Sequence, residues 1–417
     1  MEIDPKQTFE HVEGSPDLEP ENEKGLGRVE NYDLEWVAAQ KRYPRKLDLT
    51  ILPMISTLYF FEYLDRGNIA FSVCLLQIST FNVSALYVCR VFLGAFEGLF
   101  GTGIVYYVSL WYHRSEMGVR IFWFLGSTTI AGAFGGLIAY GVGHINSHIQ
   151  HWKLLFLIEG LPGFVLGLIL IAEARYHSEA FDKAGKIQKK HVIMTLTDWR
   201  LYAQAAIYIP TAALLASISG FLPTIISNLG YTEPTKANLM TVPPCACAFV
   251  LIYLVSWNSD RMKERGIHLT CLMIVAAIAY ALLATLDQSH LGSKYACMCI
   301  AVACVYATYP PSHAWAANNF GNETKRAIGM GLYTALGNCG SIAGTWLYPA
   351  QDAPRFQNGH WVAMGLALAT ACLSLGNSLS LGCINRDRDR KFGKIEEGEV
   401  VDVTEEADRS PKFRFIT

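Results

Sequence analysis

Long apolar stretches with few or no charges constrain this chain more than any other feature. Hydrophobic residues make up 52% of it and charged residues only 17%. The hydrocarbon core of a bilayer is crossed by a helix of about 20 apolar residues. Ten runs of about this length therefore predict an all-α membrane protein with ten spans. We place these spans at residues 49–72, 86–112, 121–143, 153–172, 201–227, 237–257, 267–286, 295–317, 327–349 and 361–384.

Basic residues fall almost entirely on one side of the predicted spans. The flanks on that side, beginning with residues 41–46, hold 22 Lys and Arg, whereas the opposite flanks hold four: Lys153, Lys236, Lys294 and Arg355. Because basic loops stay in the cytoplasm, both ends of the chain are predicted to be cytoplasmic. The first 40 residues lack the basic segment and apolar core of a cleaved signal peptide.

The basic segment 175–200 divides the chain into two unequal helix bundles. We predict a cytoplasmic N-terminal tail at 1–46, a four-span bundle at 47–174, a cytoplasmic loop at 175–200, a six-span bundle at 201–385 and a cytoplasmic C-terminal tail at 386–417. Both tails are polar, and we expect them to be solvated.

One span in each bundle contains the same small-residue pattern. A basic residue is followed at +12 and +15 by glycine, as in Arg120, Gly132 and Gly135, and again in Lys325, Gly337 and Gly340. Small residues at such spacing let helix backbones approach closely. The match indicates either a repeat between the two halves of a transporter or ordinary helix packing.

Two arginines and two acids lie in the first apolar runs: Asp65, Arg66, Arg90 and Glu97. A charge in hydrocarbon costs at least about 2.5 kcal/mol, so it usually faces a pathway, a partner or a solute. Arginine suits a carboxylate because its guanidinium is always charged and presents a planar fork of donors. Arg90 and Glu97 are seven residues apart and so share one helix face. Each pair could instead be a static ion pair that holds helices together.

Several segments, in a fixed order, resemble a known family. In the first half these are LDLTILPMISTLYFFEYLDRGNIA, RVFLGAFEGLFGTGIVYYVSLWYHRSEMGVR, AGAFGGLIAYG and FLIEGLPG. In the second half they are FLPTIISNLGYTEPTKANLMTVPP, SDRMKERGIHL and WAANNFGNETKRA. Together they are similar to the fungal allantoate-permease branch of the anion:cation symporters, within the major facilitator superfamily. The resemblance extends over residues 40–390.

The resemblance implies the major facilitator fold, but with ten rather than twelve transmembrane helices. Family members have six spans in each half, whereas the first half here has four. A few residues near 73–85 stand in place of the family's second and third helices and the charged loop between them. Because a pair of helices is lost, the topology of the remaining spans is preserved.

The resemblance also implies roles for the charges in the first spans. Arg66 is expected to bind a substrate carboxylate, facing the central cavity. Acids that match Asp65 and Glu97 couple transport to protons in relatives, and the arginine that matches Arg90 is their partner.

Three further polar residues are candidate substrate-binding residues: Asn68, His313 and Asn338. His313 could instead be a satisfied histidine at a helix interface, and Asn338, which lies between two glycines, could simply bridge helices. Asn82-Val-Ser84 is a glycosylation sequon on a very short outside loop. The eleven cysteines fall within or beside apolar spans, which favours packing roles over disulfides or a metal site.

These features predict a multi-pass plasma-membrane transporter that imports a small organic anion together with protons. Allantoate, nicotinate, pantothenate and biotin represent the substrate class that the resemblance implies. The proton gradient would supply the energy, without a cofactor. The chain contains no His-Glu-x-x-His or Walker motif, so we do not expect an enzyme. Its basic residues are spread over one membrane face, so we expect no nucleic-acid partner. The alternatives are a transporter of a fungal secondary metabolite and a truncated relative that does not transport.

Overall fold

The structure is a computed structural model of the chain. It describes residues 48–49, 52–57, 59–61, 83–112, 114–145, 154–155, 157–159, 161–162, 165, 189–230, 233–287, 290–394 and 406–417. The chain divides into two units, residues 1–49 and residues 50–417. The fold and the candidate site described below belong to the second unit.

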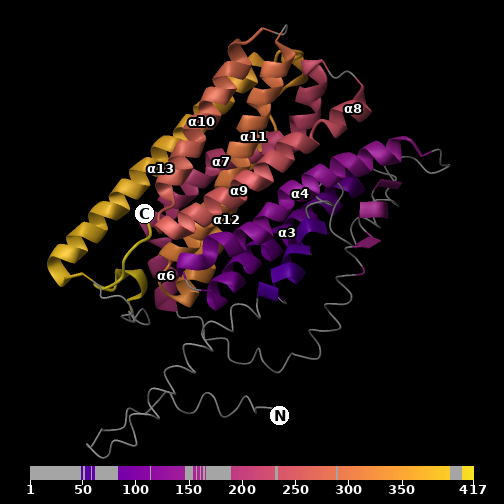
Figure 1. Ribbon diagram of the computed structural model, residues 1–417. Helices are drawn as coiled ribbons and strands as arrows, with labels where there is room; N and C mark the ends of the chain where they lie inside the picture. Colours follow the sequence, from indigo (N-terminus) through magenta and orange to yellow (C-terminus); the bar gives the residue numbers. More distant parts are fainter. Residues whose placement is uncertain are drawn as a thin grey trace, which may run out of the picture. The chain divides into compact units, whose positions relative to one another are not determined.

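The regular secondary structure of the described residues is helical (Figure 1). The α-helices are α3 (Val83–Trp111), α4 (Met117–Gly143), α6 (Lys189–Leu196), α7 (Trp199–Leu229), α8 (Pro234–Leu239), α9 (Val242–Met262), α10 (Gly266–Thr285), α11 (Leu291–Asn319), α12 (Glu323–Gly344) and α13 (Gln357–Phe392). In the part of the chain that the structure describes, three short 3₁₀ helices accompany them: η3 (Arg114–Glu116), η5 (Ala350–Asp352) and η6 (Ala407–Arg409).

Six helical stretches in the described part of the chain are long and apolar enough to cross a membrane. They are Met117–Gly143, Trp199–Leu229, Lys236–Met262, Gly266–Thr285, Leu291–Asn319 and Gln357–Phe392. These six confirm the prediction of an all-α membrane protein. The total of ten stays a prediction, because much of the predicted spans 49–72 and 153–172 lies outside the described residues. In addition, α3 and α12, which correspond to the predicted spans 86–112 and 327–349, are not among the six.

The ends of several helices follow from local sequence. Asp198 caps α7, since its carboxylate accepts a hydrogen bond from the Arg200 backbone N–H. The same helix ends at Gly230, whose φ of 136° is accessible mainly to glycine. Helix α13 continues to Phe392, eight residues past its predicted end at 384, so the predicted bundle boundary at residue 385 falls inside a helix.

Close packing between α7 and α12 depends on glycines of α12. A Cβ added at Gly340 would lie 2.7 Å from the carbonyl carbon of Ile209, and one added at Gly337 would overlap the ring of Tyr208. The matching glycines of α4 pack less tightly, since a Cβ at Gly132 would meet only the Cys245 sulfur at 3.6 Å. The sequence pattern is therefore shared by the two halves, but its close packing is not.

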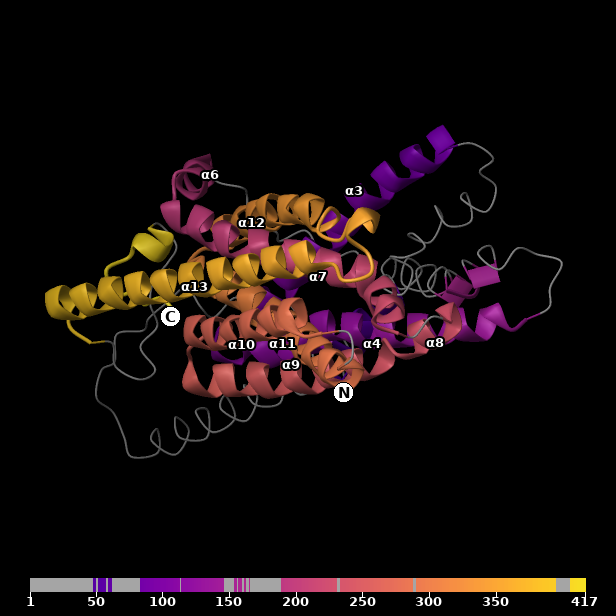
Figure 2. The same cartoon turned by 90° about the horizontal axis from the view of Figure 1, so that it is seen from above.

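Other helices pair along their lengths. Helix α10 lies beside α13, and α4 lies beside α9, as Figures 1 and 2 both show. The main core lies among α7, α9, α10, α11 and α13, where it is rich in alanine, including Ala276, Ala301 and Ala307. Small side chains let these helices approach closely, which favours association in a bilayer.

Residues 406–417 pack back against the helices. The side chains of Phe413 and Phe415 are only 3% and 4% exposed, and they share a core cluster with Trp315. The expectation of a solvated C-terminal tail is wrong for these residues, because two aromatic side chains in a polar sequence are buried among the helices.

Candidate functional site: a central cavity

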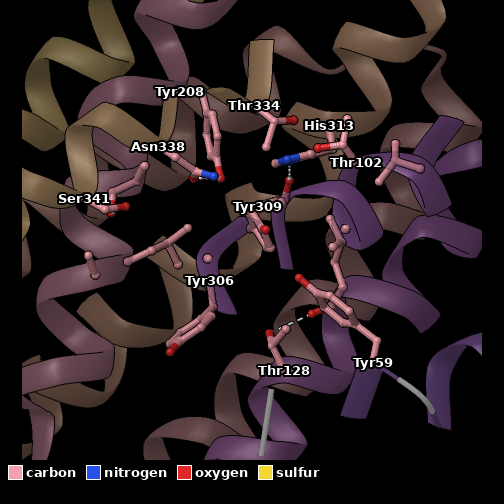
Figure 3. A pocket seen from close by; sticks show the side chains of 18 residues that line it. Tyr59, Thr102, Thr128, Tyr208, Tyr306, Tyr309, His313, Thr334, Asn338 and Ser341 are labelled. Atoms are coloured by element: carbon pink, nitrogen blue, oxygen red, sulfur yellow. Dashed lines mark hydrogen bonds between the residues drawn. The ribbon is translucent and has the colours of Figure 1, made fainter. Parts of the chain in front are cut away.

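A cavity of about 240 Å³ lies between helices from both halves of the chain. Figure 3 shows polar side chains from different helices pointing into it. Its described polar lining consists of tyrosine, threonine, serine, histidine and asparagine: Tyr59, Thr102, Thr128, Tyr208, Tyr306, Tyr309, His313, Thr334, Asn338 and Ser341. Formally charged side chains are absent from the part of the wall that the structure describes.

Glycines open the α3 side of the cavity. Gly94, Gly98 and Gly101 line it, and their spacing places all three on one face of the helix. A Cβ added at Gly94 or Gly98 would meet no atom within 4 Å, so their smallness leaves empty space. That space is available to a solute.

Tyr208 of α7 lines the cavity and contacts residues of both α11 and α12. Its hydroxyl donates to Asn338 Oδ1 over 3.1 Å. Its ring stacks on Tyr333 at 5.0 Å between centroids and meets the His313 ring edge-on at 4.9 Å. Such aromatic pairs hold the side chains in defined orientations, so this wall of the cavity is preorganised.

Helix α11 positions His313 through its own backbone. The His313 Nδ1 atom lies 3.0 Å from the Tyr309 carbonyl oxygen, so Nδ1 carries the proton and donates. A neutral imidazole held in this way presents Nε2 as a hydrogen-bond acceptor. Between the two residues stand Pro310 and Pro311, inside the helix. Prolines remove backbone donors, and in spanning helices such disruption often accompanies a binding site.

The structure brings two of the predicted site residues to this cavity: His313 and Asn338 both line it. Arg90 and Glu97 belong to α3, but their side chains lie outside the structural description. Four other predicted residues lie outside the described residues altogether: Asp65, Arg66, Asn68 and Asn82.

Sequence reasoning missed the tyrosine and hydroxyl residues of the wall. Tyr208 and Tyr309 come from helices about a hundred residues apart, and neither stands out in an apolar span. One signal was available: Tyr309 directly precedes the Pro310-Pro311 pair and lies four residues before His313. Polar residues beside a helix break were therefore the best pointer to the cavity.

Contacts between the two halves close one end of the bundle. Asp260 of α9 accepts hydrogen bonds from the Gly118 and Val119 N–H groups, over 3.0 and 2.8 Å. These groups belong to the first turn of α4, where backbone donors lack helical partners and a negative charge is favoured. Arg326 of α12 donates to the Ser109 carbonyl of α3 over 2.8 Å. We call this the latched end; by the distribution of basic residues it is the predicted cytoplasmic end.

A buried ion cluster lies at the latched end. Lys325, with a fully buried side chain, contacts Asp198 and also Asp408, the latter at 2.6 Å. Arg200 pairs with both acids. Burial by itself raises the pKa of Asp198, but hydrogen bonds and charge from Arg200 and Lys325 outweigh it and lower this pKa below its ordinary value. The Asp198 carboxylate is therefore held in its ionised form.

Comparison with known proteins identifies the class. The family model of the Major Facilitator Superfamily matches residues 67–345, about two thirds of the chain. A transporter named efuF, from Hormonema carpetanum, is 30% identical over 92% of this chain and 94% of its own length. Another, prlL from a fungal species, is 35% identical over 76% of this chain and 68% of its own. These matches define a membrane transporter rather than an enzyme.

The chain belongs to the Major Facilitator Superfamily. Its fold is similar to that of the proton:xylose symporter XylE, with a TM-score of 0.56 at 12% identity over 86% of this chain and 82% of that one. It is also similar to the fucose:proton symporter FucP, with a TM-score of 0.54 at 13% identity over 78% and 84%. The alignment with efuF runs over 468 positions, more than the 417 residues here, so that relative contains internal segments that this chain lacks.

Proposed function

We propose that this transporter imports a small organic anion together with protons across the fungal plasma membrane, with both ends of the chain in the cytoplasm. The observation that supports the proposal best is the cavity itself. It lies between helices of both halves, where alternating access in this superfamily requires a binding site. Its volume of about 240 Å³ favours a small solute over a lipid or a peptide.

The polar wall suits recognition of a carboxylate. The Tyr208 hydroxyl, the Asn338 amide and the threonine hydroxyls can all reorient to donate hydrogen bonds. A full charge partner is still required, because burying an unpaired carboxylate is costly. We assign that role to Arg66, whose guanidinium fork matches a carboxylate. Asn68 and His313 complete the proposed set of binding residues.

Proton coupling is assigned to Asp65 and Glu97, with Arg90 as the partner of Glu97. Positions 90 and 97 of α3 lie four and three residues from cavity-lining Gly94, and this helical spacing supports a role for both beside the cavity. A protonated acid no longer competes with the substrate carboxylate for an arginine. Protonation would therefore favour the loaded transporter.

One relative supports the choice of substrate class. The high-affinity nicotinic acid transporter of Saccharomyces cerevisiae is 24% identical over 90% of this chain and 85% of its own length. Nicotinic acid is a small carboxylate, as are the solutes of the allantoate-permease branch that the sequence resembles. The same class of solute is therefore the first to test here.

The test is uptake of radiolabelled nicotinate, allantoate, pantothenate and biotin by reconstituted vesicles. Uptake should rise with external acidity and collapse with a protonophore. Glu97→Gln, which mimics the protonated acid, should lose accumulation but keep counterflow exchange. Arg66→Lys should lower uptake at least about tenfold, because lysine is a point donor. The exposed Glu233 and Arg355 provide matched controls as Glu233→Gln and Arg355→Lys.

Two results would count against the proposal. Full gradient-driven accumulation by both Glu97→Gln and Asp65→Asn would reject the coupling mechanism. No counterflow with any of the four carboxylates would reject the substrate class, and would favour the second candidate function, transport of a secondary metabolite. The uncharged, tyrosine-rich part of the wall supports that candidate, because it suits a neutral aromatic solute as well.

A further inference from the structure

Residues Glu406–Thr417, here called the strap, are attached to the second half of the transporter by two buried aromatic rings. Phe413 and Phe415 pack in a cluster with Ile207 of α7, Leu269 of α10 and Trp315 of α11. In Figure 1 the strap is the yellow segment that runs from below α13 up to the label C. The rings thus tie the strap to these three helices and, through Leu381 of the same cluster, to α13 at the latched end.

Asparagine side chains satisfy the backbone of the strap. Asn319 donates to the Ile416 carbonyl over 3.1 Å and accepts from the Ile416 N–H over 2.9 Å. Asn385 makes the same reciprocal pair with Phe415, at 2.7 and 2.9 Å. The Trp315 indole N–H also donates to the Ile416 carbonyl, over 2.8 Å. Reciprocal amide pairs of this kind fix the register of the strap on the helices.

The strap also completes the buried ion cluster. Asp408 contacts Lys325 of α12 and Arg200 of α7, and its side chain is 1% exposed. Arg388 of α13 donates to the Asp408 carbonyl over 2.9 Å. Removing an acid from such a cluster leaves buried positive charge, which is strongly unfavourable. The cluster therefore favours the docked strap.

Arg114 of the first half contacts the strap. The Arg114 guanidinium stands over the Phe413 ring at 4.3 Å from the centroid, and its Nη2 lies 3.4 Å from the Arg414 carbonyl oxygen. The same nitrogen donates to the Asn318 carbonyl of α11, while the Asn318 amide donates back to the Arg114 carbonyl over 2.9 Å. Arg114 follows α3, so this contact joins the first half to the strap and to α11.

We propose that the docked strap holds the latched end closed. Its contact with Arg114 must break before the cavity opens at that end. The reason is geometric. Alternating access rocks one bundle against the other, while the strap is anchored on the second bundle and Arg114 belongs to the first. The contacts that Arg114 makes with Phe413 and Asn318 cannot survive such a separation. A docked strap therefore stabilises the closed state of this end.

Hydrogen exchange followed by mass spectrometry tests the proposal on the purified full chain, without knowledge of the substrate. In Phe413→Ala the strap amides at 415 and 416 should exchange roughly tenfold faster. The amides of Gly118 and Val119, which donate to Asp260 across the two halves, should also exchange severalfold faster, because the latched end opens more often. Arg114→Gln, which leaves the anchor on the second bundle intact, should speed exchange at 118 and 119 in the same way.

The control is Arg409→Ala, an exposed strap residue whose loss should leave both regions protected. Faster exchange in the strap of Phe413→Ala, together with unchanged protection at 118 and 119 in both variants, would overturn the proposal. If Phe413→Ala does not fold, Phe413→Leu takes its place, because leucine keeps an apolar anchor but removes the ring over which the Arg114 guanidinium stands. Unchanged exchange at 118 and 119 in that variant would show that the strap is a packing segment without control over the latched end.

Discussion

The contact between α7 and α12 provides a sharp test of the packing described above. Replacing Gly340 by alanine adds one methyl group where there is no room for it. The new Cβ would lie 2.7 Å from the Ile209 carbonyl carbon and closer still to its oxygen, whereas an ordinary contact needs at least 3.4 Å. Helix α12 must therefore move away from α7 by about 1 Å or more. Overpacking of this kind typically costs about 1–3 kcal/mol.

The same displacement reaches the cavity. Asn338 lies half a turn before Gly340, and its hydrogen bond with the Tyr208 hydroxyl is 3.1 Å long. A shift of about 1 Å would lengthen it beyond hydrogen-bonding range. We therefore expect Gly340→Ala to lower both thermal stability and transport, by disturbing a wall that Gly340 itself does not line.

Thermal unfolding in detergent, followed by intrinsic fluorescence, measures the first effect. The matched control is Gly331→Ala in the same helix, where an added Cβ would meet nothing within 4 Å. Alanine is the better helix former, so the control should be as stable as the parent protein or slightly more stable. Gly340→Ala should unfold a few degrees lower. Equal midpoints for the two variants would refute the close approach of α12 to α7.

Two further substitutions test the latched end. Asp198→Asn should destabilise the protein on the order of 3 kcal/mol at neutral pH, because it leaves buried Lys325 and Arg200 with one acid fewer. Since the pKa of Asp198 is lowered by folding, its contribution is complete above the ordinary aspartate pKa of about 4 and is lost as the pH falls through the folded-state pKa. The stability difference from the parent protein should therefore persist at pH 7 and shrink only below about pH 4; a difference that does not change with pH would contradict this assignment. Gly118→Ala should weaken the contact between Asp260 and the first turn of α4, because the added Cβ would lie 2.9 Å from Asp260 Cγ and closer to the carboxylate oxygen. Gly141→Ala is the control in the same helix, since a Cβ there would meet nothing within 4 Å. Hydrogen exchange at Val119 should speed up only in the first of these variants, and equal rates in both would contradict the prediction.

The sequence by itself determined the class of protein. Apolar length and the scarcity of charge decide whether a segment can span a bilayer, and both can be counted without knowledge of the fold. Helices α10 and α11 accordingly lie where the sequence places the spans 267–286 and 295–317. Local chemistry also fixes helix ends, as at Gly230. His313 could be predicted as a candidate binding residue because it lies near Trp315, Asn318 and Asn319, at the end of a predicted span.

Only the tertiary structure decided which residues meet. Tyr208 and Asn338 are 130 residues apart, and nothing in either span indicates that the hydroxyl of one would donate to the other. The strap is the clearest case. Its sequence is polar enough to be expected in solvent, but Phe413 and Phe415 pack in a cluster that exists only after α7, α10, α11 and α13 have assembled. Hydropathy is a property of a segment taken alone, whereas burial depends on partners supplied by the rest of the chain.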